Sequence, residues 1–132
     1  MTRSEAREQA FFVLFEKIFC EDETIEEIVG NAQEAGLIKI NNFASVLLEK
    51  AGSNGDEIDT IIADNLRGWS IQRLPKVSLA VLRLAVCEML YFDDIPVGVS
   101  INEAVELCKK YAAKDDYAFV NGVLSAASKE DK

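Results

Sequence analysis

The segment Val99-Ser-Ile-Asn-Glu-Ala-Val-Glu-Leu-Cys-Lys-Lys-Tyr111 decides the fold, together with Phe119-Val-Asn-Gly-Val-Leu124 shortly after it. Both segments carry apolar residues at helical spacing. Ser100 and Glu103 have the S-x-x-E spacing of a capping box, in which the serine hydroxyl and the glutamate carboxylate each accept a backbone amide. The spacing therefore predicts a helix that begins at Ser100 and ends near Ala112.

Two asparagines, Asn102 and Asn121, interrupt these apolar helical runs. Helix propensity does not favour asparagine, because its side chain competes for backbone hydrogen bonds. Arg83 and Glu88 interrupt another apolar helix, predicted over residues 77–91, and charges on a central helix are seldom left unpaired. We expect these charges to pair with other helices or to join both asparagines in a buried polar network that fixes the packing.

Helical periodicity continues along the chain, and no alternating strand pattern is evident. We predict an all-α fold, a compact bundle of about seven helices in two small helical subdomains, within a single domain over residues 1–132. The connector Trp69–Leu74 divides the chain into halves of about 1–68 and 69–128, and the apolar helix after it should lie in the middle of the protein. Helix starts are expected at capping boxes, N-cap residues and a proline: Thr2 with Glu5, Thr24 with Glu27, Asn41 or Asn42, Asp56, Pro75, and Asp115 or Asp116.

The net charge of −9 comes from the first half of the chain. Residues 1–66 carry 5 basic and 14 acidic side chains, whereas residues 67–132 carry 9 of each. An acidic surface of this kind either keeps the protein soluble or docks a basic partner. It excludes strong, general binding of polyanions, so any contact with RNA must be local.

The residue types argue against catalysis and against metal binding. The chain has no histidine, no glycine-rich phosphate loop and no nucleophile elbow. Its cysteines, Cys20, Cys87 and Cys108, are widely separated and form no metal-ligand pattern. We expect no enzyme, no metal and no cofactor, but a cytoplasmic protein with three reduced core thiols. No apolar run is long enough to cross a membrane, and the N-terminus is too polar for a signal peptide.

The C-terminal motifs resemble the NusB family of transcription antitermination proteins. That family has an Ile-Asn-Glu-Ala helix followed by Phe-Val-Asn-Gly-Val-Leu, and its Leu-Arg-x-Ala-x-x-Glu pattern recurs as Leu82-Arg-Leu-Ala-Val-Cys-Glu88. The resemblance runs from about Arg3 to Leu124. It implies a NusB-like fold and an RNA-binding adaptor without catalytic activity. Such an adaptor pairs with NusE, the small-subunit ribosomal protein, and binds boxA-type single-stranded RNA within the RNA polymerase antitermination complex on ribosomal RNA operons.

Arg3 and Arg7 lie four residues apart and share one face of the first helical turns. Their guanidinium groups match phosphate oxygens, but arginines on a solvated face also commonly pair with a neighbouring glutamate. The resemblance favours the contact with an RNA phosphate, because the family has an arginine-rich N-terminus that contacts RNA. The family also has an aromatic residue at the position of Phe15. Glu5 stands where the family often has another basic residue, so the cluster is thinned here.

Phe119 has the spacing of a core aromatic residue. The resemblance implies that this phenylalanine is a platform on which an RNA base stacks. Asp115 corresponds to the edge of that surface, where a carboxylate repels phosphate, and Lys114 is close enough in sequence to supply compensating charge. The candidate RNA-binding residues are therefore Arg3, Arg7, Phe15, Lys114, Asp115 and Phe119.

Two other functions remain open at this point. NusB-like domains also occur as accessory modules at the front of RNA cytosine methyltransferases, whose chains would continue past Lys132 into an α/β domain. The other hypothesis is a structural homodimer without a role in RNA binding, which an RNA-binding assay would separate from the adaptor.

Overall fold

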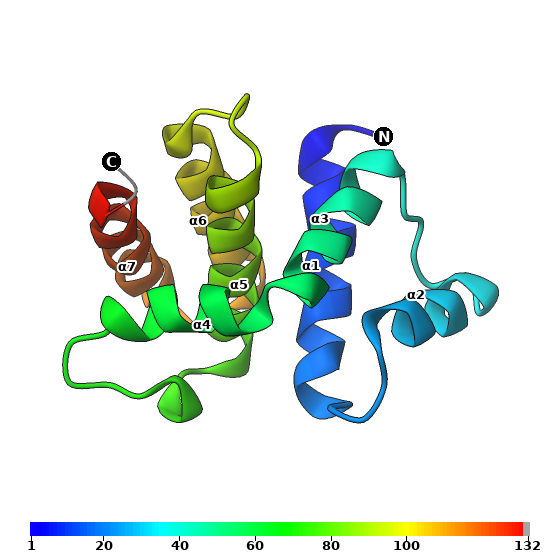
Figure 1. Cartoon of the computed structure of the whole chain (residues 1–132), viewed down its shortest axis with the longest axis horizontal. Coiled ribbons are helices and arrows are strands. Elements are labelled where there is room, and N and C mark those ends of the chain that lie inside the picture. Colours follow the sequence, from blue (N-terminus) through cyan, green and yellow to red (C-terminus); the bar gives the residue numbers. More distant parts are fainter. Residues whose placement is uncertain (131–132) are drawn as a thin grey trace.

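The structure is a computed structural model that describes residues 1–130, and within that range it consists of helices and connecting loops (Figure 1). This confirms the all-α fold class that the sequence predicts. The seven α-helices of the described range are α1 (Arg3–Phe19), α2 (Ile25–Glu34), α3 (Asn42–Ser53), α4 (Gly55–Asp64), α5 (Lys76–Tyr91), α6 (Val97–Tyr111) and α7 (Asp116–Glu130), and the 3-10 turn η1 (Ile71–Arg73) precedes α5.

The first two helices begin at the predicted capping boxes. The Thr2 hydroxyl accepts from the amide of Glu5, whose carboxylate accepts from the Thr2 amide at 2.8 Å. Thr24 and Glu27 repeat the arrangement at α2. These bonds from backbone amides favour the charged carboxylate, so the pKa of each glutamate is lowered.

Helix α5 lies in the middle of the protein, as its nearly continuous apolar sequence predicts. It packs against α1, α3, α4, α6 and α7. Every residue from Leu79 to Glu88 is buried except Arg83. A helix buried on nearly all sides gives the surrounding helices one common surface on which to pack.

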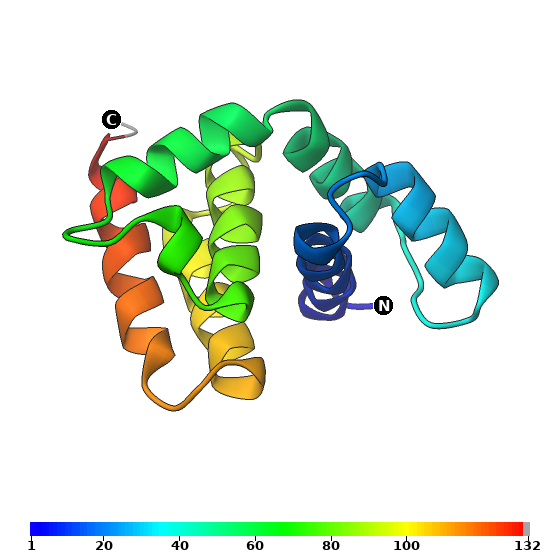
Figure 2. The same ribbon diagram turned by 90° about the horizontal axis from the view of Figure 1, so that it is seen from below.

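The helices form two groups that differ from the predicted halves. Figure 2 shows α1, α2 and α3 on one side, and α4 on the other side with α5, α6 and α7. Helix α4 packs against α5 and α7, and its Ile58 and Ile62 are fully buried. The division therefore falls near Asn54, where α3 ends and α4 begins, rather than between residues 68 and 69. A short turn in the sequence does not reveal the angle between the helices that it joins, which long-range packing sets.

Helix α6 begins one turn before its predicted start. Pro96 is its N-cap, and proline suits that position because its φ is fixed and it has no N–H to satisfy. Ser100 is consequently inside the helix and buried, where its hydroxyl donates to the carboxylate of Glu88. The predicted capping box of Ser100 and Glu103 is wrong, because the hydroxyl bonds to a buried carboxylate of α5 instead of a backbone amide.

Two of the three free cysteines are core thiols as expected. Cys87 and Cys108 are buried, and burial raises the pKa of each thiol to about 12. Cys20 is half-exposed at the end of α1, contrary to the prediction.

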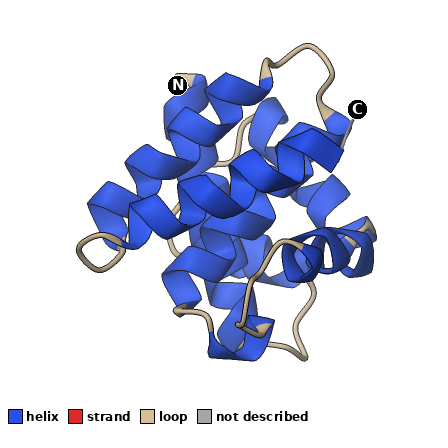
Figure 3. Ribbon diagram, turned by 90° about the vertical axis from the view of Figure 1, so that its left-hand side faces the viewer, coloured by secondary structure: helices blue, strands red, loops and turns tan. Residues whose placement is uncertain are grey.

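Figure 3 shows how the helices cross one another. Within residues 1–130, no helix is both long and apolar enough to cross a membrane.

Candidate nucleic-acid interface

A buried ion cluster joins α1 to α5 and α6. The Arg7 guanidinium donates from Nε to Oε1 of Glu88 at 2.6 Å and from Nη2 to Oε2 at 3.2 Å. Its Nη1 lies 3.4 Å from Oε1 of Glu103, and the ring of Phe43 on α3 lies 5.3 Å from the guanidinium carbon. Arg7 is 5% exposed and Glu88 is 2% exposed, so both charges are out of water and depend on each other.

This cluster argues against the prediction that Arg7 holds an RNA phosphate. The donors of its guanidinium point to two carboxylates of the protein itself, and its side chain is covered. Binding a phosphate there would break a buried ion pair. Arg7 therefore has a structural role inside the protein. Arg3, four residues earlier, is exposed instead.

Arg3 is exposed at the start of α1. Its guanidinium carbon lies 4.7 Å from the centre of the Phe43 ring, and its Nη2 lies 3.9 Å from a carboxylate oxygen of Asp94. Such an exposed ion pair contributes little to stability. Arg3 is thus held only by this exposed ion pair and by the ring of Phe43.

Arg83 and Glu88 pair with other helices, which was one of the two alternatives predicted for them, and the alternative of a network with Asn102 and Asn121 is not formed. Glu88 belongs to the cluster of Arg7, whereas Arg83 donates two hydrogen bonds of 2.9 Å to Asp59 on α4. Asn102 and Asn121 are exposed on the outer face of α6 and α7. They lie there because these helices bury other faces, on which Ala104, Leu107 and Cys108 of α6 and Val120, Val123, Leu124 and Ala127 of α7 lie.

The start of α7 carries three of the candidate RNA-binding residues. Lys114 and Asp115 are exposed in the turn before the helix, and Asp115 has a φ of 75°, the left-handed region that aspartate tolerates better than most residues. Phe119 is half-buried, and the centre of its ring lies 6.5 Å from that of Trp69 at an interplanar angle of 62°. The two aromatic residues contribute to a cleft of about 210 Å³.

Lys114 differs from the two lysines at the end of α6 in its ion pairing. Lys110 donates to Glu8 at 2.5 Å, a bond that lowers the pKa of Glu8, and Lys109 lies 3.7 Å from Glu106. Among the described residues Lys114 has no such carboxylate partner. Its ammonium group would therefore meet a phosphate without first leaving a salt bridge.

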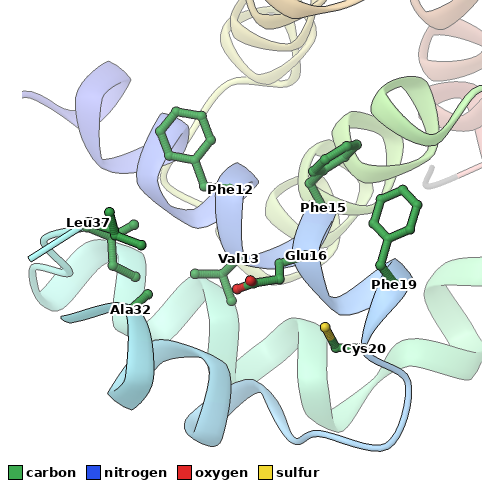
Figure 4. A pocket seen from close by; sticks show the side chains of 9 residues that line it. Phe12, Val13, Phe15, Glu16, Phe19, Cys20, Ala32 and Leu37 are labelled. Atoms are coloured by element: carbon green, nitrogen blue, oxygen red, sulfur yellow. The ribbon is translucent and has the colours of Figure 1, made fainter. Parts of the chain in front are cut away.

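Phe15 lies in a different place, within an apolar groove between α1 and the segment that follows α2. Its ring is edge-on to that of Phe19, with centres 5.1 Å apart. Figure 4 shows Phe12, Phe15 and Phe19 along α1, with Leu37 across a groove of about 470 Å³. Twelve residues separate Phe15 from Arg3, which is about 18 Å along a helix. The structure thus distributes the candidates over three surfaces instead of one.

Sequence reasoning missed Trp69 and Ser78, which line the cleft beside Phe119. Trp69 stands in the segment that we treated only as a connector, and Ser78 lies in the apolar run of α5. The one available signal was the single tryptophan of the chain, placed in a connector where no core explains it.

Together, the fold and the site define an all-α protein with an ion pair buried beside its central helix and an aromatic cleft open at its surface. The chain belongs to the NusB family, whose model matches residues 4–129. This confirms the resemblance seen in the C-terminal motifs.

Relatives match the chain along nearly its whole length. It is 41% identical to the transcription antitermination protein NusB of Lachnoclostridium phytofermentans, over 95% of this chain and 97% of that protein. It is 40% identical to the protein of that name from Listeria monocytogenes serotype 4a, over 100% of both chains.

Solved structures of the family have the same fold. T. maritima NusB matches with a TM-score of 0.88 and 33% identity, covering 98% of this chain and 92% of that one. A structure described as antitermination factors NusB and NusE in complex with double-stranded RNA matches with a TM-score of 0.85 and 36% identity, over 97% and 96% of the chains.

Replacing Arg7 with alanine should destabilise the fold by about 3–5 kcal/mol, because it leaves the carboxylate of Glu88 buried without its partner. The matched control is Arg83→Ala, which removes a half-exposed pair with Asp59 and should cost about 1 kcal/mol or less. Urea denaturation measures both. Equal losses for the two variants would show that the Arg7 cluster has no special structural role.

Asn102→Ala and Asn121→Ala should each leave stability unchanged or raise it by about 0.5 kcal/mol, because alanine favours a helix and neither side chain has a buried partner. Thermal denaturation of each variant measures the change. A loss of more than about 1 kcal/mol would show that these side chains make a buried hydrogen bond after all.

Proposed function

We propose that this protein is a bacterial transcription antitermination factor that works as an RNA-binding adaptor. With NusE it binds boxA-type single-stranded RNA in the nascent transcript and so keeps RNA polymerase elongating through ribosomal RNA operons. The proposal places the whole chain, residues 1–132, in the cytoplasm as one RNA-binding domain and gives it no catalytic step.

The observation that carries this proposal is the end-to-end match to proteins named transcription antitermination protein NusB, at about 40% identity and 97–100% of their length. That coverage favours the adaptor over an accessory module of an RNA methyltransferase. The solved complex of NusB and NusE with double-stranded RNA supports NusE and RNA as the classes of partner.

The charges of this chain explain why an adaptor needs a partner. The net charge is −9, and Arg7 is occupied by its own carboxylates. Arg3 and Lys114 are the exposed cations among the candidates, and they belong to different surfaces. RNA binding by the isolated chain is therefore weak, and a second RNA-binding protein held on the same complex raises the affinity through effective concentration.

Within this function, the candidate residues contribute different interactions. Lys114 neutralises a phosphate, Phe119 offers a ring on which a base stacks, and Asp115 opposes phosphate and thereby limits affinity. Arg3 adds a phosphate contact on a separate surface, at the start of α1. Phe15 offers an aromatic ring on the third surface, the apolar groove along α1.

The test is a titration of labelled boxA RNA with the protein, with NusE and with both, followed by fluorescence anisotropy at several salt concentrations. The pair should bind at least about tenfold more tightly than the protein alone. Absence of binding by the pair, or equal affinity with and without NusE, would refute the proposed adaptor.

Two variants separate phosphate contact from stacking in the same assay. Lys114→Ala should reduce the slope of log affinity against log salt by about 0.7, whereas Phe119→Ala should weaken binding by about 1–3 kcal/mol and leave the slope unchanged. Lys129→Ala, an exposed lysine at the far end of α7, is the matched charge control and should change neither. Thermal denaturation must show that Phe119→Ala is folded, and equal slopes for Lys114→Ala and Lys129→Ala would contradict the assignment.

A further inference from the structure

A groove of about 310 Å³ lies between α2 and α3 and contains none of the candidate RNA-binding residues. Helix α2 is at the edge of the molecule, where it packs against α1 and α3 (Figure 2). Of its ten residues only Ile28 is fully buried. The fold therefore leaves part of the apolar surface of α2 uncovered, and four aliphatic side chains from α2, the loop after it and α3 line the groove: Ile25, Val29, Ile40 and Leu48.

The groove also carries unneutralised negative charge. Glu26 of α2 and Glu49 of α3 line it, and both side chains are exposed. Among residues 1–130 neither carboxylate has an ion-pair partner. Residues 21–34, which include α2, carry six acidic side chains and no basic one. Such a surface repels phosphate groups and anionic lipids and attracts basic groups.

Gly30 is the residue of this groove that the fold does not explain. Glycine is among the weakest helix formers, yet Gly30 lies inside α2. Its φ is not positive, and a Cβ atom at this position would meet no other atom within 4 Å. Neither the backbone nor the packing therefore demands a glycine. The missing side chain leaves room for another chain to approach the helix closely.

We propose that the groove between α2 and α3 is a docking site for a basic amphipathic helix of a partner protein. Aliphatic side chains on one face of that helix enter the groove beside Gly30. Lysines or arginines next to them pair with Glu26 and Glu49, so the charges of the two surfaces are complementary. This inference goes beyond the proposed function, because it adds a protein-binding surface that shares no residue with the candidate RNA-binding set.

The lining of the groove favours a helix over other forms of bound peptide. An added strand needs the exposed edge of a sheet, and residues 1–130 form no strand. A proline-rich segment needs a groove lined by aromatic side chains, and no aromatic residue lines this one. An aliphatic groove between two helices instead suits the mode in which an amphipathic helix inserts its apolar face.

The first test uses a labelled peptide of leucine and lysine, about 14 residues or roughly four helical turns long, with its leucines on one face. The full chain should bind this peptide in fluorescence anisotropy. Glutamate in place of every lysine, or alanine in place of every leucine, should weaken binding by at least about tenfold. The amide signal of Gly30 should shift in nuclear magnetic resonance. Absence of binding, or binding that leaves Gly30 unchanged, would overturn the docking site.

Gly30→Leu is the sharpest variant because stability and affinity should move in opposite directions. Leucine favours a helix and has open space at this position, so the melting temperature should equal or exceed that of the wild type. The leucine side chain would fill the groove, and affinity for the leucine–lysine peptide should fall by at least about tenfold. Gly122→Leu, at an equally open position of α7, is the matched control and should bind the peptide normally. Wild-type affinity in Gly30→Leu would contradict the proposal.

A second pair of variants tests the charges of the groove. The double variant Glu26→Gln with Glu49→Gln should bind the peptide about three- to tenfold more weakly at low salt. Glu34→Gln with Asp64→Asn, which changes two exposed carboxylates outside the groove, is the control and should have a smaller effect. Equal losses in the two double variants would show that the peptide responds only to the net charge of the protein, and would overturn the site.

NusE distinguishes this surface from the one on which the proposed function depends. Peptide and NusE should bind the full chain together, and Gly30→Leu should bind boxA RNA with NusE as tightly as the wild type does. Displacement of the peptide by NusE would assign the groove to NusE and overturn a separate docking site. Failure of the wild type to bind RNA even with NusE would refute the proposed function and leave the groove unaffected.

Discussion

The ion pair between Arg7 and Glu88 is the interaction on which the arrangement of the helices depends. It ties the first helix to the central one, and the hydroxyl of Ser100 and the carboxylate of Glu103 extend it to α6. Removing both charges from water is costly, so a pair of this kind contributes less to total stability than its short distances suggest. It instead sets the register, because any sliding of α1 along α5 would leave two charges buried and separated.

That register has a consequence for function. With Arg7 turned inward, one of the candidate cations is withdrawn from the surface of an acidic protein. Under the proposed function, its contribution to RNA binding would come from local phosphate contacts and from aromatic stacking. The start of α7 offers both, with Lys114 in the turn and Phe119 beside Trp69. If the isolated chain binds RNA weakly, as proposed, it would bind effectively only as part of an assembly, and binding would depend on the partner.

Local features of the fold could be predicted from the sequence, and long-range ones could not. The capping boxes of Thr2 and Thr24 depend on residues three apart, and the central position of α5 follows from its composition alone. The partner of Arg7 lies 81 residues away, so the sequence showed only a basic residue on an amphipathic helix. The start of α6 was misplaced for the same reason, since Ser100 has good capping spacing but a distant carboxylate as its acceptor. The aromatic cleft, assembled from a connector and two helices, exists only in the folded chain.

The central claim is that RNA meets the aromatic cleft at the start of α7, while Arg7 remains inside the protein. Nuclear magnetic resonance of the full chain, titrated with boxA RNA, tests it most directly because each group has its own signal. The indole N–H of Trp69 and the amides of Lys114 and Phe119 should shift, and the Nε–H of Arg7, held by Glu88, should not. Large shifts at Arg7 with no change at Trp69 and Phe119 would contradict this account.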